Sequence, residues 1–222
     1  MNWIPQPPSL AIAPDRFAHA TVVDHHHPQR AEIEAFISGI YRKRFNAHLR
    51  AFLPDLIAYH TTDGELVAAV GFRMASNGHL FFEQYLDAPV EQVLSAAGIE
   101  DGDRRHLVEV GNFAACAPGV ARELIIQLAR VLDAAGIRWV LFVATRELRN
   151  AFSRLHLRPM DLGAADGRRL GNALREWGSY YDTQPRLMCG DIREGLAFLG
   201  RQSDALQRAR HASARPIRSL SC

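Results

Sequence analysis

The amino-acid sequence predicts a single α/β domain, built on a mixed sheet with helices on both faces. The strongest indication is a strand at 107–113, a helix at 119–135 and a strand at 139–144, which together form one right-handed crossover unit. A β-hairpin at 56–72 adds antiparallel strands, so the sheet is expected to be mixed. The 222 residues, 48% hydrophobic and 23% charged, are enough for one buried core.

The first part of the chain is expected to begin as an extended arm, because residues 1–16 contain four prolines. Pro28 suits the first turn of a long helix, in which apolar residues recur at helical spacing from Ile33 to Leu49. The pair Asp63-Gly64 is a hairpin signal. The elements expected here are the arm 1–16, a strand at 20–24, a helix at 28–49 and strands at 56–59 and 66–72.

The second part of the chain is dominated by one amphipathic helix, which Gly136 ends. Its apolar stripe consists of Ala121, Leu124, Ile125, Leu128, Val131 and Leu132. The strand at 139–144 is continuously apolar, as expected of a strand covered on both faces. The other expected elements are a helix at 81–97 broken at Pro89, a helix at 147–155, an irregular region at 158–190 and a frayed, arginine-rich tail at 200–222. The domain itself is expected to occupy 17–199.

The charge and the cysteines narrow the class of protein. A net charge of +2 gives no field that favours nucleic acid. The three cysteines, Cys116, Cys189 and Cys222, are few and widely spaced, which favours a reducing compartment. Residues 1–5 show neither the basic region nor the apolar stretch expected of a signal peptide, and the sequence contains no apolar run of about 20 residues that could span a membrane. We therefore expect a cytoplasmic protein without an integral membrane segment.

Several stretches of the sequence resemble the thermostable hemolysin family, over roughly residues 20–195. They are Val108–Ala114, Pro118–Arg122, Trp177–Tyr181 and Met188–Ile192. That family looks like a branch of the GCN5-related N-acetyltransferase (GNAT) superfold. The resemblance implies a GNAT-like fold and transfer of an acyl group from a thioester donor, with no permanently bound cofactor.

Within the superfold, the donor-binding loop lies where this chain has Gly119 and Ala121. The N-terminus of the following helix would offer N–H groups and a partial positive charge to a phosphate. Cys116 takes the place of the usual Arg or Gln, and Pro118 removes one N–H donor. Either acyl carrier protein or acyl-CoA would serve as donor. The residues expected to bind it are Val110, Asn112, Cys116, Gly119, Val120, Ala121 and Asn150.

A looser likeness connects the chain to acyl-homoserine-lactone synthases, which use acyl carrier protein on the same superfold. The matching residues are Arg44-Phe45, Gly71-Phe72-Arg73 and Glu109. Gly111-Asn112 replaces the serine-arginine pair of those enzymes, so lactone formation is not expected. The apolar residues of 81–97 would line an acyl channel or belong to the core. The residues expected to bind substrate are Arg44, Phe45, Arg73, Phe82 and Trp177.

Two residues are expected to carry the chemistry. Glu109 lies within a strand, where a buried carboxylate needs a partner. It would act as the general base that deprotonates an amine, or it would form an ion pair with an arginine such as Arg73. Tyr180 would act as the general acid for the leaving thiolate, as tyrosines do in this superfold, or it would pack against Trp177. Tyr180 and Tyr181 are expected on one strand, facing opposite sides.

Other residues suggest sites that the sequence does not complete. His25, His26 and His27 are adjacent, so their side chains diverge and we expect no metal site. Cys116 lacks a histidine nearby in sequence that could activate it as a nucleophile. The function expected is an N-acyltransferase with a small amine acceptor, and the sequence leaves a homodimer open. A membrane-lytic toxin and a catalytically silent acyl-binding module are the alternatives.

Overall fold

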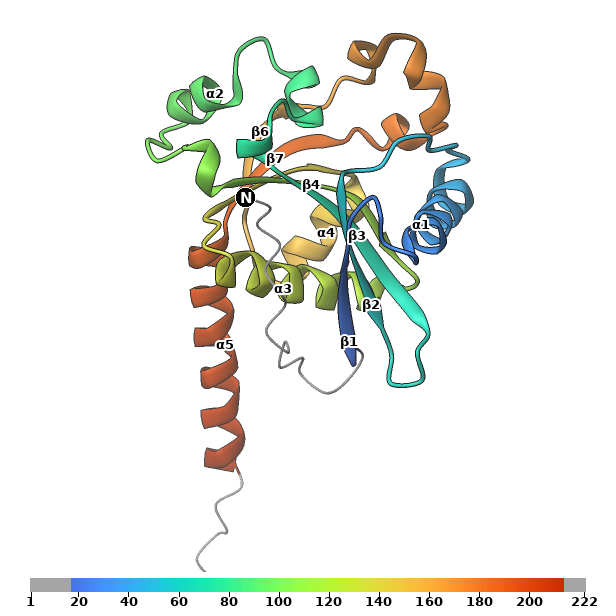
Figure 1. The fold of residues 1–222 in the computed structure, drawn as a ribbon. Coiled ribbons are helices and arrows are strands. Elements are labelled where there is room, and N and C mark those ends of the chain that lie inside the picture. The colour runs from blue at the N-terminus through green and yellow to red at the C-terminus, as the bar shows by residue number, and fades with distance from the viewer. Residues whose placement is uncertain (1–16, 214–222) are drawn as a thin grey trace, which may run out of the picture.

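The computed structural model describes residues 17–213, which form a seven-stranded sheet with helices packed against it (Figure 1). The strand order is β1-β2-β3-β4-β5-β7-β6. Neighbouring strands are antiparallel, except that β4 and β5 are parallel. The strands are β1 (His19–Val23), β2 (Asp55–His60), β3 (Leu66–Met74), β4 (Leu107–Ala115), β5 (Trp139–Ala144), β6 (Met160–Ala164) and β7 (Arg186–Asp191). The predicted mixed sheet is confirmed.

Helices cover both faces of the sheet, also as predicted. On what we call the α3 face lie α3 (Pro118–Ala134), α4 (Arg146–Arg154) and α5 (Ile192–Ser213). On the opposite α1 face lie α1 (Arg30–Phe45), α2 (Val90–Ala96) and the 3-10 helices η2 (Phe81–Tyr85), η4 (Gly167–Trp177) and η5 (Tyr180–Thr183). Two further 3-10 helices are η1 (Ala75–Asn77) and η3 (Arg104–His106).

The crossover unit β4-α3-β5 forms as the sequence predicts. The apolar stripe of α3 buries Leu124, Ile125, Leu128 and Leu132 against the α3 face. Burying each such side chain contributes about 1.5–3 kcal/mol of transfer free energy. This stripe therefore fixes α3 across the parallel pair β4 and β5, at the centre of the sheet.

Helix α1 is shorter than the predicted helix 28–49. It ends at Phe45, because Asn46 adopts a left-handed conformation with φ of 52°. The chain from 46 to 54 then crosses the α1 face as a loop. Arg30, buried at the start of α1, holds the end of this loop by donating to the carbonyl oxygens of Leu53 (2.8 Å) and Pro54 (2.7 Å).

The other differences lie after residue 80. The predicted helix 81–97 is two elements, the 3-10 helix η2 and the helix α2, with the expected break at Pro89. The region 158–190 is not irregular, since it contains β6 and β7, which extend the sheet beyond β5. Tyr180 and Tyr181 begin the 3-10 helix η5 and do not lie on a strand.

The tail beyond Gly200 also differs from the prediction. Helix α5 continues through this glycine to Ser213, so residues 200–213 are helical and not irregular. Figure 1 shows α5 projecting away from the body of the domain. The predicted arm 1–16 and tail residues 214–222 lie outside the described residues.

Candidate functional site

The two central strands separate halfway along their length. Pairing between β4 and β5 ends with Val110 and Phe142, although both strands continue beyond these residues. After the cross-strand pair Gly71 and Gly111, β4 has one residue more than β3 before the next pair. This β-bulge contains Asn112, whose φ of 50° is left-handed. Because a bulge bends its strand, it accounts for the turning of β4 away from β5.

A cavity of about 1220 Å³ occupies this opening and has walls on both faces of the sheet. Its wall on the α3 face has an apolar part, formed by Ile125, Leu128, Leu132, Leu148, Phe152 and Phe198, and also includes polar residues of α4 and α5 such as Ser153 and Glu194. Its wall on the α1 face combines charged and aromatic residues and includes Arg73, Phe81, Tyr85, Glu109, Trp177 and Tyr181. Two reactants could therefore enter from opposite faces and meet between β4 and β5.

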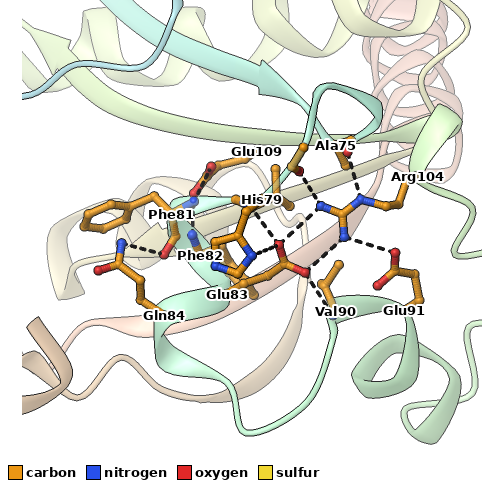
Figure 2. A network of polar contacts seen from close by, with 12 residues as sticks. Ala75, His79, Phe81, Phe82, Glu83, Gln84, Val90, Glu91, Arg104 and Glu109 are labelled. Carbon is orange, nitrogen blue, oxygen red and sulfur yellow. Dashed lines mark hydrogen bonds and ion pairs between the residues drawn. The ribbon is translucent and has the colours of Figure 1, made fainter.

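Glu109 is a buried carboxylate on the α1-face wall, with 4% of its surface exposed. Its Oε2 accepts a hydrogen bond from the backbone N–H of Phe81 (2.9 Å), and its Oε1 accepts one from that of Phe82 (2.6 Å), as Figure 2 shows. Burial raises the pKa of Glu109, while these two N–H groups and the charge of Arg73 oppose the rise. A buried carboxylate with a raised pKa is suited to accept a proton near neutral pH.

Among the described residues, the ion pair between Glu109 and Arg73 that the sequence suggested as an alternative is not formed, and Glu109 makes these backbone contacts in its place. Arg73 lies directly across from Glu109 on β3, but its guanidinium donates to the carbonyl oxygen of His79 (2.8 Å). Both side chains thus hold the segment that begins η2. Sequence reasoning could not have found these partners, because they are main-chain atoms that no residue type identifies.

A second buried carboxylate, Glu83, fixes the other end of the same segment (Figure 2). Arg104 donates to both of its oxygens, at 3.0 and 3.2 Å, and also donates to the carbonyl oxygen of Ala75. The N–H groups of Leu80 (2.8 Å) and Val90 (3.3 Å) complete the contacts. The segment from η1 to α2, which forms part of the α1-face wall, is therefore tied to η3.

Aromatic side chains make up much of the α1-face wall. Tyr180 is buried, stacks on Tyr41 at 6.1 Å between ring centroids and packs on Trp177 at 5.1 Å. Its hydroxyl donates to the carbonyl oxygen of Val143 at 3.5 Å, and burial raises its pKa well above the ordinary value. Tyr180 thus packs against Trp177, as one of its two expected roles requires, and it also lines the cavity. Proton transfer by this hydroxyl remains a prediction.

Opposite Tyr180, the hydroxyl groups of Tyr85 and Tyr181 form a hydrogen bond that links η2 to η5. Both rings line the cavity. The sequence prediction did not include Tyr85, although its position one helical turn after Phe81 in an aromatic segment was a usable signal. The link completes the wall between two segments that are about a hundred residues apart in sequence.

The predicted donor loop does not line the cavity that the described residues form. Neither its residues Cys116, Gly119, Val120 and Ala121 nor the predicted donor-binding Asn150 belongs to the cavity wall. The N–H groups of Val120 and Ala121 already donate to the carbonyl oxygen of Ala117, at 3.0 and 3.2 Å. Cys116 and Asn150 are exposed. At this end of the sheet, the N-terminus of α3 offers fewer N–H donors than the sequence suggested.

The other predicted residues are divided between the cavity and its surroundings. Arg44 lies near the start of α3 and α4, where it donates to Ala115 O and Glu147 Oε2, both at 3.2 Å. Phe45 packs edge-on against Tyr180, behind the wall. The predicted residues that line the cavity are Arg73, Glu109, Val110, Asn112, Trp177 and Tyr180.

Phe82 differs from its expected role as a substrate-binding residue. Its side chain is fully buried in the core beneath η2, and the preceding residue, Phe81, lines the cavity instead. Asn112 has a structural role in addition to its place at the cavity, because its Oδ1 accepts from the N–H of Leu53 at 2.8 Å. This contact fixes the loop 46–54 against the bulge.

Within residues 17–213, no group of three or more His, Cys, Asp or Glu side chains is arranged to hold a metal ion. His26 and His27 take part in a local turn, in which the N–H of His26 donates to Asp24 and Nδ1 of His27 accepts from the N–H of Gln29. A search of the same described residues found no helix of the length and apolar character needed to cross a membrane.

Comparisons with known proteins agree with the fold. A family model described as thermostable hemolysin matches residues 23–196. No curated protein sequence shows significant similarity. Among solved structures, TofI in an apo form is 16% identical, with 82% of this chain and 96% of that chain covered and a TM-score of 0.54.

Two further solved structures have the same fold. FeeM, an N-acyl amino acid synthase from uncultured soil microbes, is 12% identical, with 80% of this chain and 92% of that chain covered and a TM-score of 0.53. BjaI, a CoA-dependent acyl-homoserine lactone synthase solved with SAM and isopentyl-CoA, is 11% identical, with 85% and 89% covered and a TM-score of 0.51. Identities this low show the fold alone, and the predicted GNAT-like fold is confirmed.

Proposed function

The chain belongs to the thermostable hemolysin family, and from that premise we propose that it is an N-acyltransferase. It would move an acyl group from a phosphopantetheine thioester to the amine of a small acceptor. The observation that carries this proposal is the cavity between β4 and β5, which is lined by a group of apolar side chains on one face and by the buried Glu109 on the other. Such a passage suits two reactants held in one ternary complex, where proximity supplies much of the rate.

On the α1 face, Glu109 would take one proton from the acceptor ammonium. The free amine would then attack the thioester carbonyl carbon, forming the C–N bond. Collapse of the tetrahedral intermediate breaks the C–S bond, and the nitrogen loses its second proton. Tyr180 would supply a proton to the leaving thiolate and regain one from the nitrogen, so that the products are an amide and a free thiol.

On the α3 face, the apolar part of the wall would hold the acyl chain. Ile125 and Leu128 of α3 and Phe152 of α4 line the same cavity as Glu109. Arg44, near the start of α3, would attract the donor phosphate. Either acyl carrier protein or acyl-CoA would be the donor in this proposal. The protein would act in the cytoplasm, where both donors occur.

Mass-spectrometric comparison of lipid extracts tests the proposed function. Cells that express the chain should contain an N-acyl species that is missing from empty cells and from cells expressing the Glu109→Gln variant. The toxin alternative predicts a different result. Purified protein would then lyse red cells without any thioester donor, and no new N-acyl species would be found.

A further inference from the structure

Two opposite charges lie side by side on the α1-face wall of the cavity. Arg73 on β3 and Glu109 on β4 are direct cross-strand partners, and both line the cavity. The Cβ atoms of such partners are typically about 4.5–5.5 Å apart. A single small molecule could therefore contact both head groups at once.

Neither charge neutralises the other through a direct ion pair, as far as the described residues show. Arg73 donates from Nη1 to the carbonyl oxygen of His79, and Glu109 accepts the N–H groups of Phe81 and Phe82. A guanidinium has five N–H donors, and a carboxylate has about four acceptor positions. Both groups thus keep hydrogen-bonding capacity after these contacts are made.

The wall around this pair is aromatic. Trp177 packs on both Phe81 and Tyr181, with ring centroids 5.9 Å and 5.8 Å apart. The hydroxyl of Tyr181 bonds that of Tyr85, so these two polar atoms satisfy each other. An ammonium group is attracted to aromatic faces, and an apolar side group would pack well on the same rings.

We propose that the acceptor amine is an α-amino acid with an apolar side chain. Its carboxylate would accept from the guanidinium of Arg73, and its ammonium would donate to Glu109, which takes the proton before the amine attacks. A simple alkylamine would offer Arg73 no carboxylate to bind after Glu109 has taken the proton and lost its charge. The inference rests on the proposed function and adds to it the class of acceptor.

Three amines with the same side chain test the inference, namely leucine, leucinamide and 3-methylbutan-1-amine. Purified protein would be given decanoyl-CoA or decanoyl acyl carrier protein, and kcat/KM would be measured for each amine. Leucine is expected to exceed the other two by about 10- to 100-fold, since hydrogen bonds to charged groups are the strong ones. The Arg73→Gln variant should lose this preference, so that its kcat/KM for leucine falls to within about threefold of its own kcat/KM for leucinamide.

Two further variants make the result specific. Arg73→Lys keeps the positive charge but loses the planar guanidinium that can bind a carboxylate through two N–H groups, so it should retain part of the preference for leucine. Arg50→Gln is the matched control, because Arg50 also lines the cavity but pairs with Glu176, and it should keep the full preference. Equal use of all three amines, or an unchanged preference in Arg73→Gln, would overturn the inference and leave the acyltransferase standing. Transfer to none of the amines would overturn both.

Discussion

Replacing Arg104 by alanine removes the cation that holds Glu83 inside the protein. In the native structure Arg104 donates to both oxygens of Glu83, to Glu91 (3.0 Å), and to the carbonyl oxygens of Ala75 (2.8 Å) and Gly78 (2.5 Å). In the described part of the chain, the variant leaves Glu83 buried with backbone N–H groups and a histidine as its remaining partners. Breaking a buried ion pair in this way costs about 3–5 kcal/mol of the free energy of unfolding.

The effect should depend on pH. Burial by itself would raise the pKa of Glu83, but the hydrogen bond from Arg104 and those from Leu80 and Val90 lower it to about 2 from an ordinary 4.5. A lowered pKa contributes stability that is present above about pH 4.5 and is lost as the pH falls through about 2. The difference between wild type and Arg104→Ala is therefore expected to be largest near neutral pH and to shrink below pH 4.5.

Urea unfolding followed by circular dichroism, at pH 7 and at pH 3, measures both effects. The matched control is Arg105→Ala, since Arg105 is the next residue, is 77% exposed and, within residues 17–213, forms its ion pair with the exposed Asp103 alone. That change should stay within about 0.5 kcal/mol of wild type. A loss of less than about 1 kcal/mol in Arg104→Ala would refute the idea that this pair stabilises the wall of the cavity.

Four other changes have definite expected results. Gly178→Ala should lower the free energy of unfolding by at least about 1–3 kcal/mol in urea titrations, because φ is 51° and an added Cβ would collide with the carbonyl oxygen of Phe45. Leu128→Trp should fill the α3-face part of the cavity and slow long-chain donors at least about tenfold relative to acetyl-CoA in steady-state assays. Cys116→Ala should leave kcat unchanged, since the exposed thiol lies outside the cavity walls. Glu109→Gln should reduce kcat/KM by about 10²–10⁴-fold and abolish the acid limb of the wild-type pH profile, which should lie above pH 4.5 because burial raises this pKa.

The central elements of the fold could be predicted because their sequences carry strong periodic patterns. The apolar stripe of α3 indicates an amphipathic helix, and the continuous apolar run of β5 indicates a strand covered on both faces. Strands β6 and β7 were missed, since Gly163 interrupts the first and Met188-Cys189-Gly190 gives the second no clear alternation. They form because the edge of β5 is available for pairing, which is a property of the whole sheet.

The sequence was sufficient to predict where the site lies, but not which atoms its residues contact. The strand pattern correctly indicated that Glu109 is buried. Its partners are the N–H groups at the start of η2, and a short 3-10 helix leaves no periodic signal from which they could be inferred. In the same way, Arg104 and Arg105 are identical neighbours in sequence, and only tertiary packing decides that Arg104 turns inward to Glu83.

The central claim is that an acyl group passes from a thioester to an amine beside Glu109. The most direct measurement uses purified protein, a ¹³C-labelled acyl thioester and a mixture of amino acids, with the N-acyl product and the released thiol quantified together. The account predicts equal amounts of labelled amide and thiol from the wild type. It also predicts a loss of at least about 100-fold in Glu109→Gln at a pH where both proteins are folded. No labelled amide from any donor, or an undiminished rate in Glu109→Gln, would contradict it.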